Sequence, residues 1–265
     1  KSRVIKLTEN NGNISDVQLE DGRVLSSRFV ISDIHPATLL PLIDSKLIRP
    51  IYRKRIQNLK NSFGMFTVNI KLKPNTMKYK NQNIFLYSDD VDMWHFEKSN
   101  NVVKQVMVSY PVPDNYASNT EIFSETIDLL SPIDFSEVAQ WSETKFGSRP
   151  NSYYDFKQRK AEEIINFVCR YLPELRESID VYYTSSPLSY SYYTSTVNGS
   201  AYGIMKDCNN VLTTFLTPKT PIGNLFMTGQ NLNLHGILGV SMTSSLTCAE
   251  IVGMEKVISE IKINK

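Results

Sequence analysis

A short strand, a glycine-bearing loop and a helix are predicted to follow one another near the end of this chain. Leu225–Thr228 is an apolar run of strand length, and the polar loop after it carries Gly229 and Gly236. We expect a long helix to begin near 237–239 and to run close to the C-terminus. Free N–H groups and the positive dipole end at such a helix start favour a negative or electron-rich ligand group. The alternative is that the glycines only turn the chain, as in many α/β proteins.

The first residues predict a β-meander. Residues 3–7 and 14–19 alternate apolar and polar side chains around an Asn-Gly turn. Asp21-Gly22 is a hairpin signal, because both residues tolerate the positive φ of a tight turn. The apolar run 29–31 is typical of a strand buried on both faces, and His35-Pro36 opens a helical stretch.

The middle of the chain has a different pattern. Residues 63–72, 84–87 and 102–110 are rich in β-branched and aromatic side chains, which predicts strands. Two helices are predicted next. One contains Ile122, Ile127, Leu129 and Leu130, and the other contains Ala161, Ile164, Ile165, Val168 and Tyr171 and ends before Pro173.

Composition excludes several classes of protein. The 265 residues are 41% hydrophobic with a net charge of +2, which is globular and too near neutral for a nucleic-acid protein. The three cysteines, Cys169, Cys208 and Cys248, are far apart and form no CxxC pair, and His35, His95 and His235 lack metal-ligand spacing. We therefore expect neither a metal site nor a disulfide framework. No GxSxG or Cys/His arrangement points to nucleophilic catalysis.

No export signal is recognised in the sequence. It has no signal peptide and no run of about 18 apolar residues, so a cytoplasmic location with peripheral membrane contact as an option is expected. It begins at Lys1 and enters a strand pattern at once, so we expect a fragment of a longer protein.

A basic run with interleaved aliphatic residues lies at 46–60. Its cations are Lys46, Arg49, Arg53, Lys54, Arg55 and Lys60. One interpretation is a solvated amphipathic helix. The other is an interfacial helix that contacts a membrane surface.

Three segments carry a resemblance to a known family. Residues 223–253, GNLFMTGQNLNLHGILGVSMTSSLTCAEIVG, closely resemble the C-terminal flavin-binding signature of the phytoene dehydrogenase, carotenoid isomerase and retinol saturase group of FAD-dependent oxidoreductases. Residues 186–203, with Ser-Pro-Leu-Ser-Tyr and Gly-Ser-Ala-Tyr-Gly, look like a second family block. The opening meander also matches.

The resemblance implies an α/β protein of mixed α+β content with an amine-oxidase-like fold. Residues 1–45 and 205–265 would form part of a Rossmann-like FAD domain. Residues 46–204 would form a substrate domain built on a mixed sheet with helices.

The resemblance also implies which residues contact the cofactor. Seven residues of the loop and helix start are carried over: Gly229, Gln230, Gly236, Ile237, Leu238, Gly239 and Val240. The family's N-terminal GxGxxG, which receives the pyrophosphate, has no counterpart in this sequence. We therefore expect FAD to bind in the full-length parent and not to be retained by this chain alone. NAD(P) is left open as a further cofactor.

Aromatic residues suggest where a substrate would lie. Tyr190, Tyr192 and Tyr193 belong to a tyrosine-rich stretch that predicts either an aromatic wall for an extended polyene or ordinary strand composition. His235, inside the glycine loop, is the one candidate catalytic residue, with a structural role as the alternative. Flavin chemistry needs few protein groups, because the cofactor carries the hydride.

Two functions remain open. The first is a flavin-dependent enzyme that desaturates, saturates or isomerises C=C bonds of a carotenoid, a retinoid or a similar apolar isoprenoid. The second is a non-catalytic module that binds a hydrophobic ligand or a membrane surface.

Overall fold

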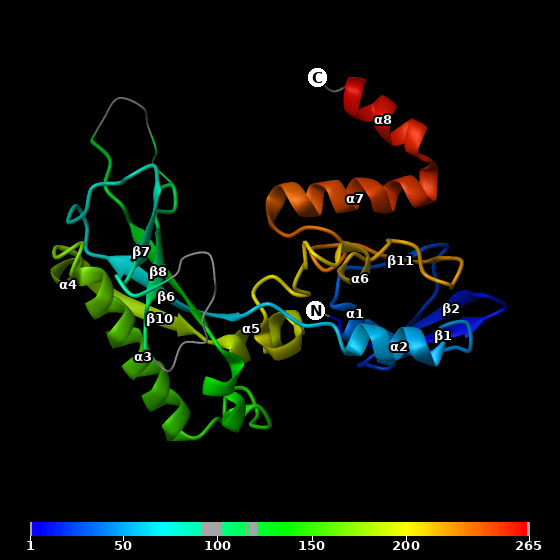
Figure 1. Cartoon of the computed structure of the whole chain (residues 1–265), viewed down its shortest axis with the longest axis horizontal. Helices are drawn as coiled ribbons and strands as arrows, with labels where there is room; N and C mark the ends of the chain where they lie inside the picture. The colour runs from blue at the N-terminus through cyan, green and yellow to red at the C-terminus, as the bar shows by residue number, and fades with distance from the viewer. Residues whose placement is uncertain (1, 92–101, 115, 117–120, 264–265) are drawn as a thin grey trace. The chain divides into compact units, whose positions relative to one another are not determined.

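The computed structural model in Figure 1 describes residues 2–91, 102–114, 116 and 121–263. The chain divides into two compact units. Unit 1 contains residues 1–62 and 194–265, and unit 2 contains residues 63–193. Each unit has its own hydrophobic core.

Unit 1 begins with the expected meander. Its four-stranded sheet has the order β3-β2-β1-β5, built from β1 (Val4–Asn10), β2 (Asn13–Leu19), β3 (Val24–Leu25) and β5 (Ile43–Asp44). β1 pairs with β2 antiparallel and with β5 parallel, so this sheet is mixed. Asn11 and Gly12 both have positive φ and close the first hairpin, as the Asn-Gly pair predicts.

A second, two-stranded sheet joins the two ends of unit 1. β4 (Val30–Ser32) pairs parallel with β11 (Leu225–Met227), whose three residues are buried. Asn224 connects this pair to the meander. Its buried amide accepts from the backbone N–H of Ile14 at 2.7 Å and donates to the carbonyl of the same residue at 2.9 Å. Residues 210 positions apart in the sequence are thus held together by one side chain.

Helices of different lengths complete unit 1. They are α1 (Pro36–Leu39), α2 (Pro50–Gln57), α6 (Val211–Thr214), α7 (Gly236–Val252), α8 (Met254–Ile263) and the 3-10 helices η1 (Leu40–Leu42) and η4 (Val197–Gly199). The expected C-terminal helix is interrupted at Gly253, where φ is +91°. α7 and α8 are therefore two helices and not one.

Unit 2 is a five-stranded sheet of order β10-β6-β9-β8-β7. Its strands are β6 (Gly64–Leu72), β7 (Asn83–Tyr87), β8 (Gln105–Ser109), β9 (Thr126–Ile133) and β10 (Ile179–Ser185). All four pairings are antiparallel, whereas a mixed sheet was expected for this part. The remaining elements are η2 (Phe135–Glu137), η3 (Ala139–Trp141), α3 (Asn151–Cys169), α4 (Leu175–Ser178) and α5 (Pro187–Thr194).

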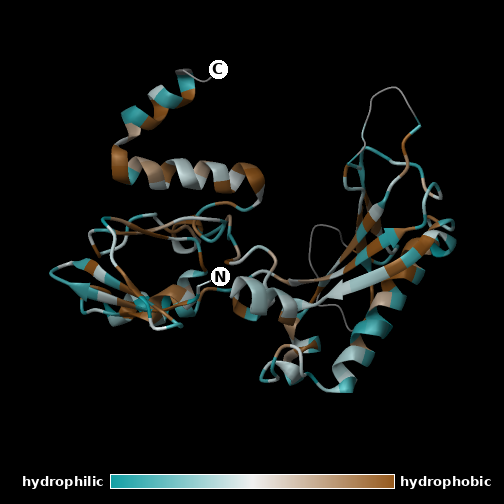
Figure 2. Cartoon of the chain, turned by 180° about the vertical axis from the view of Figure 1, so that it is seen from behind, coloured by the Kyte–Doolittle hydropathy of each residue, from teal (hydrophilic) through white to brown (hydrophobic). Residues whose placement is uncertain are grey.

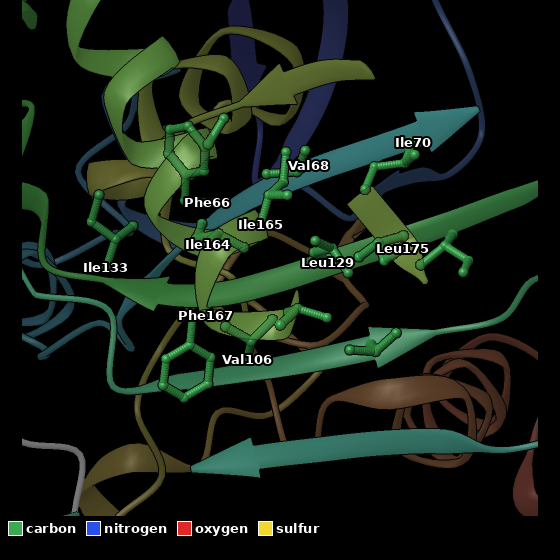
Figure 3. Close-up of a cluster of buried hydrophobic side chains, with 14 of the residues drawn as sticks. Phe66, Val68, Ile70, Val106, Leu129, Ile133, Ile164, Ile165, Phe167 and Leu175 are labelled. Carbon is green, nitrogen blue, oxygen red and sulfur yellow. The ribbon is translucent and has the colours of Figure 1, made fainter. Parts of the chain in front are cut away.

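One face of this sheet packs against α3. Phe66, Val68 and Leu129 lie opposite Ile164 and Ile165 of the helix in the close-up of Figure 3, and all five are fully buried. Burial of this kind contributes about 1.5–3 kcal/mol for each large apolar side chain. The helical periodicity of 161–171 predicted α3 correctly.

The predicted helix around 122–130 is wrong, because this segment contains β9. Ile127, Leu129 and Ile133 alternate along the strand and face the core, and β6 and β8 pair with it on either side. A short apolar run fits both the helical and the strand period. The pairing with β6 and β8 decided that this segment is a strand.

The domain boundaries near 45 and 204 also need correction. Residues 46–62 and 194–204 belong to unit 1, because Ile48, Ile56 and Ile204 are buried in its core and Asn61 forms a bridge with Ile204. The predicted basic helix is the eight-residue α2, and Ile56 is its buried side chain. Among the described residues, no helix is long and apolar enough to cross a bilayer.

Candidate functional site

The carboxyl ends of β4 and β11 meet where the glycine loop starts. The N–H of Thr228 donates to the carbonyl of Ser32 at 2.9 Å, and Gly229 follows with φ of +89°. A Cβ on Gly229 would lie 3.4 Å from the backbone oxygen of Asp33. Open α/β sheets bind ligands outside the carboxyl ends of their strands, so the loop begins at such a position.

The start of α7 is open. His235 occupies the N-cap position, but its side chain makes no capping hydrogen bond. Gly236 has φ of +76°, and a Cβ there would meet nothing within 4 Å. The next residues, Ile237 and Leu238, are 88% and 74% exposed. The first N–H groups of a helix have no intrahelical partner, so this terminus offers donors and a positive dipole end.

Figure 2 colours both ends of α7 as hydrophobic. Ile237 and Leu238 follow Gly236 at the start of this helix, and both are exposed. An apolar surface with uncapped donors suits a flat ligand that has polar atoms along one edge.

Gly239 has a structural role within the loop. A Cβ at this position would lie 2.6 Å from the carbonyl carbon of Leu234 and 2.7 Å from its oxygen. The chain's own backbone therefore fills the space beside Gly239, whereas the space beside Gly236 is open. The two glycines look equivalent in the sequence, but the structure separates them by backbone conformation and by contacts.

Sequence reasoning missed two residues that hold the loop, Asn231 and Lys206. The buried Oδ1 of Asn231 accepts from the N–H of Ile204 at 3.1 Å. Nζ of Lys206 donates to the carbonyls of Asn231 and Leu232 at 2.8 and 2.9 Å. Burial lowers the pKa of Lys206 to about 8. Their only sequence signal was proximity to the Gly-Ser-Ala-Tyr-Gly block and to the loop itself.

The two histidines within the described residues have different environments. The exposed ring of His235 lies 4.4 Å from the ring of Tyr202, between centroids and at an angle of 36°. His35 is buried; its Nδ1 accepts from the N–H of Ala37, and its Nε2 bonds Oδ1 of Asn61 at 2.7 Å. Burial lowers the pKa of His35, which favours the neutral ring. His35 is therefore a structural cap of α1, and His95 lies outside the described residues.

The three predicted tyrosines lie together on α5, in unit 2. Tyr190 bonds Oγ1 of Thr67 through its hydroxyl at 2.9 Å. Tyr192 stacks on Phe146 with 4.0 Å between centroids, and Tyr193 is 72% exposed. They belong to a helix, so the alternative interpretation as strand composition is wrong for them.

Curated relatives of this chain are retinol reductases. It is 24% identical over 238 residues to the all-trans-retinol 13,14-reductase of Rattus norvegicus, covering 84% of this chain and 39% of that protein. It is 25% identical over 140 residues to the enzyme of Homo sapiens, covering 52% of this chain and 23% of that protein. The resemblance to the retinol saturase group is confirmed. No protein-family model matches the chain.

Solved structures show the fold. An oxidoreductase from Methanosarcina mazei superposes with a TM-score of 0.52 at 13% identity, over 98% of this chain and 49% of the other. Cyclohexylamine oxidase from Brevibacterium oxydans gives 0.52 at 11% identity, over 98% and 48%. The expected α/β class with an amine-oxidase-like fold is thereby confirmed. The chain spans less than half the length of the retinol reductases and about half that of these structures.

Proposed function

We propose that this chain supplies the C-terminal part of a flavin-dependent oxidoreductase that acts on C=C bonds of a retinoid, a carotenoid or a similar apolar isoprenoid. One observation carries the proposal. The uncapped start of α7, reached from buried β11 through the glycine loop, occurs in a chain that is similar over 84% of its length to the all-trans-retinol 13,14-reductase of Rattus norvegicus.

The residues at this site fit the edge of a flavin. Gly236 leaves room for close approach, and the N–H groups that follow suit the carbonyl oxygens of a flat ring system. The loop and helix start, from Gly229 and Gln230 to Val240, would hold the cofactor by backbone contacts. When bound, FAD would accept or deliver the hydride. The protein's own task is then to orient the substrate and exclude water.

Unit 2 offers an apolar surface for such a substrate. On the sheet face opposite α3, Thr67, Leu130, Met107 and Phe85 form one row of direct cross-strand neighbours. Phe85 is 59% exposed, and Tyr183 on the same face is 69% exposed. A polyene has no polar groups along its length, so exposed apolar area is what would hold it. The row and α5 together are the proposed substrate contacts.

The test uses the full-length form, by which we mean a protein of the relatives' length that contains this chain. It should purify with about one FAD and convert all-trans-retinol under reducing conditions. Gly236→Ala should weaken FAD binding, measured by fluorescence titration. Gly147→Ala is the matched control, because Gly147 also has positive φ (+84°) and open space around a Cβ, in unit 2.

Both substitutions impose similar backbone strain, about 1–2 kcal/mol for a left-handed residue. A loss of FAD affinity confined to the Gly236 variant supports the site. Equal affinity of both variants and the wild type would exclude Gly236 from it. The 265-residue chain alone should be colourless after purification, because it lacks the phosphate-binding GxGxxG motif.

The second candidate function is attachment to an anionic membrane through α2. Ile51, Lys54 and Arg55 are exposed on this helix, whereas Arg53 is already bonded to the carbonyls of Leu40 and Ile43. Each basic side chain near an anionic surface contributes about 1 kcal/mol. Flotation with anionic liposomes should fall with salt and with Lys54→Glu plus Arg55→Glu. Unchanged flotation would leave α2 as a solvated helix.

A further inference from the structure

Lys206 is a half-buried lysine whose ammonium faces three backbone carbonyls from two segments of unit 1. Nζ lies 2.9 Å from the oxygen of Thr214, at the end of α6, and 2.8 and 2.9 Å from those of Asn231 and Leu232 in the glycine loop. The ring of Phe215 lies 5.5 Å from the same nitrogen. Lys206 is not among the site residues predicted from the sequence.

The number of donors matches the number of acceptors only in one protonation state. An ammonium group has three N–H donors, whereas a neutral amine has two. Deprotonation of Lys206 would leave one of the three carbonyls without an N–H donor from this side chain. A carbonyl that loses part of its hydrogen bonding away from water destabilises the surrounding structure.

The hydrogen bonds from Lys206 reach the middle of the loop, which is its buried part. Asn231 and Leu232 are buried, whereas Leu234 to Leu238 are exposed. Further bonds also hold the buried part. The N–H of Ile204 donates to Oδ1 of Asn231, and the N–H of Leu216 donates to the carbonyl of Leu232. Lys206 is the side chain that joins the two carbonyls to α6.

We propose that Lys206 is a positioning residue that fixes the loop 229–236 and thereby the start of α7 for the cofactor. The assignment to a cofactor rests on the proposed function, whereas the anchoring of the loop does not. Lys206 acts through the loop backbone and touches no reacting group.

The partial burial of Lys206, and not a neighbouring charge, makes the anchor sensitive to alkaline pH. Burial lowers the pKa of Lys206 to about 8. The charge of Lys206 acts on His35, which is neutral at this pH because its own pKa is lowered. From α2, Arg55 donates to the neighbouring carbonyl of Thr213 at 3.3 Å, and Asp207 bonds the N–H of Asn209 at 2.9 Å. Above pH 8 the lysine loses its third donor, so the loop loses part of its anchor.

The first test uses the 265-residue chain and needs no flavin. Backbone carbonyl ¹³C shifts of Thr214, Asn231 and Leu232 are followed from pH 6 to 10. The wild type should show one common midpoint near 8, far below the ordinary lysine pKa of about 10.4. Lys206→Met should abolish it and shift all three carbonyls at pH 7. Lys219→Met, a change at an exposed lysine of the same unit, should behave as the wild type.

The second test measures FAD affinity of the full-length form between pH 7 and 9. Wild-type affinity should fall about tenfold, which corresponds to about 1.4 kcal/mol. Lys206→Arg should stay flat, because its guanidinium remains charged at every pH used. This variant also keeps the test decisive if Lys206→Met fails to fold.

The outcomes separate the two ideas. Carbonyl shifts that ignore both pH and Lys206→Met overturn the anchor, whatever FAD does. Carbonyl shifts that respond, in a full-length form that binds no FAD at any pH, support the anchor and overturn the proposed function. A wild type and Lys206→Arg with the same FAD affinity profile would overturn the positioning role in cofactor binding.

Discussion

Substituting Gly239 by alanine tests whether this glycine is required by the loop itself. The added Cβ would lie 2.6 Å from both the carbonyl carbon and the Cβ of Leu234. Ordinary carbon contacts are about 3.5–4.0 Å, so the loop must move by about 1 Å. The obstacle includes backbone, which cannot rotate away as the tip of a side chain can.

The size of the effect follows from two opposing contributions. Overpacking of this kind costs about 1–3 kcal/mol. A glycine inside a helix is about 1 kcal/mol less favourable than alanine, so the substitution recovers that amount. We therefore expect Gly239→Ala to lower the free energy of unfolding of the chain by about 0–2 kcal/mol. Gly239→Leu should be worse, and in the full-length form it should abolish FAD retention while circular dichroism stays nearly unchanged.

Urea denaturation followed by circular dichroism measures the change in the 265-residue chain. Ser244→Ala, at an exposed position of α7, is the control for helix propensity and should be neutral or slightly stabilising. If Gly239→Ala raises the free energy of unfolding by about 1 kcal/mol, as in an unobstructed helix, the contact with Leu234 is not present in solution.

Two further predictions concern the stability of unit 1. Asn224→Ala removes both hydrogen bonds to the backbone of Ile14 and should lower the free energy of unfolding by about 2–5 kcal/mol in a urea titration. The control is Asn13→Ala, which should change it little, because the side-chain amide of Asn13 makes an exposed hydrogen bond of 3.4 Å. Equal effects would contradict the role of Asn224. Acidification should also destabilise the unit, because the folded-state pKa of His35 is lowered. The unfolded chain then binds more protons as pH falls below about 6.5, so stability present above that pH is lost below it. His35→Asn, which keeps an N-cap, should reduce the pH dependence of the urea midpoint between pH 7.5 and 5, and an unchanged dependence would refute this assignment.

Local patterns predicted those elements whose reason lies in neighbouring residues. The Asn-Gly hairpin needs only two residues that tolerate positive φ, and α3 needs only a run of apolar residues at helical spacing. The strand, loop and helix around Gly229 and Gly236 were likewise predicted from their order along the chain. The resemblance to the retinol saturase group also came from contiguous residues.

Tertiary structure decided everything that depends on partners distant in sequence. β9 is a strand because β6 and β8 pair with it, although its apolar residues also fit a helix. The segment 46–62 joins unit 1 because Ile48 and Ile56 are buried in its core, and no local signal marks that choice. Gly236 has a positive φ and open space beside it, whereas Gly239 lies against the backbone of Leu234. Lys206 matters because three carbonyls converge on it. Local conformation follows from a few adjacent side chains, whereas burial and convergence arise only when the chain folds back on itself.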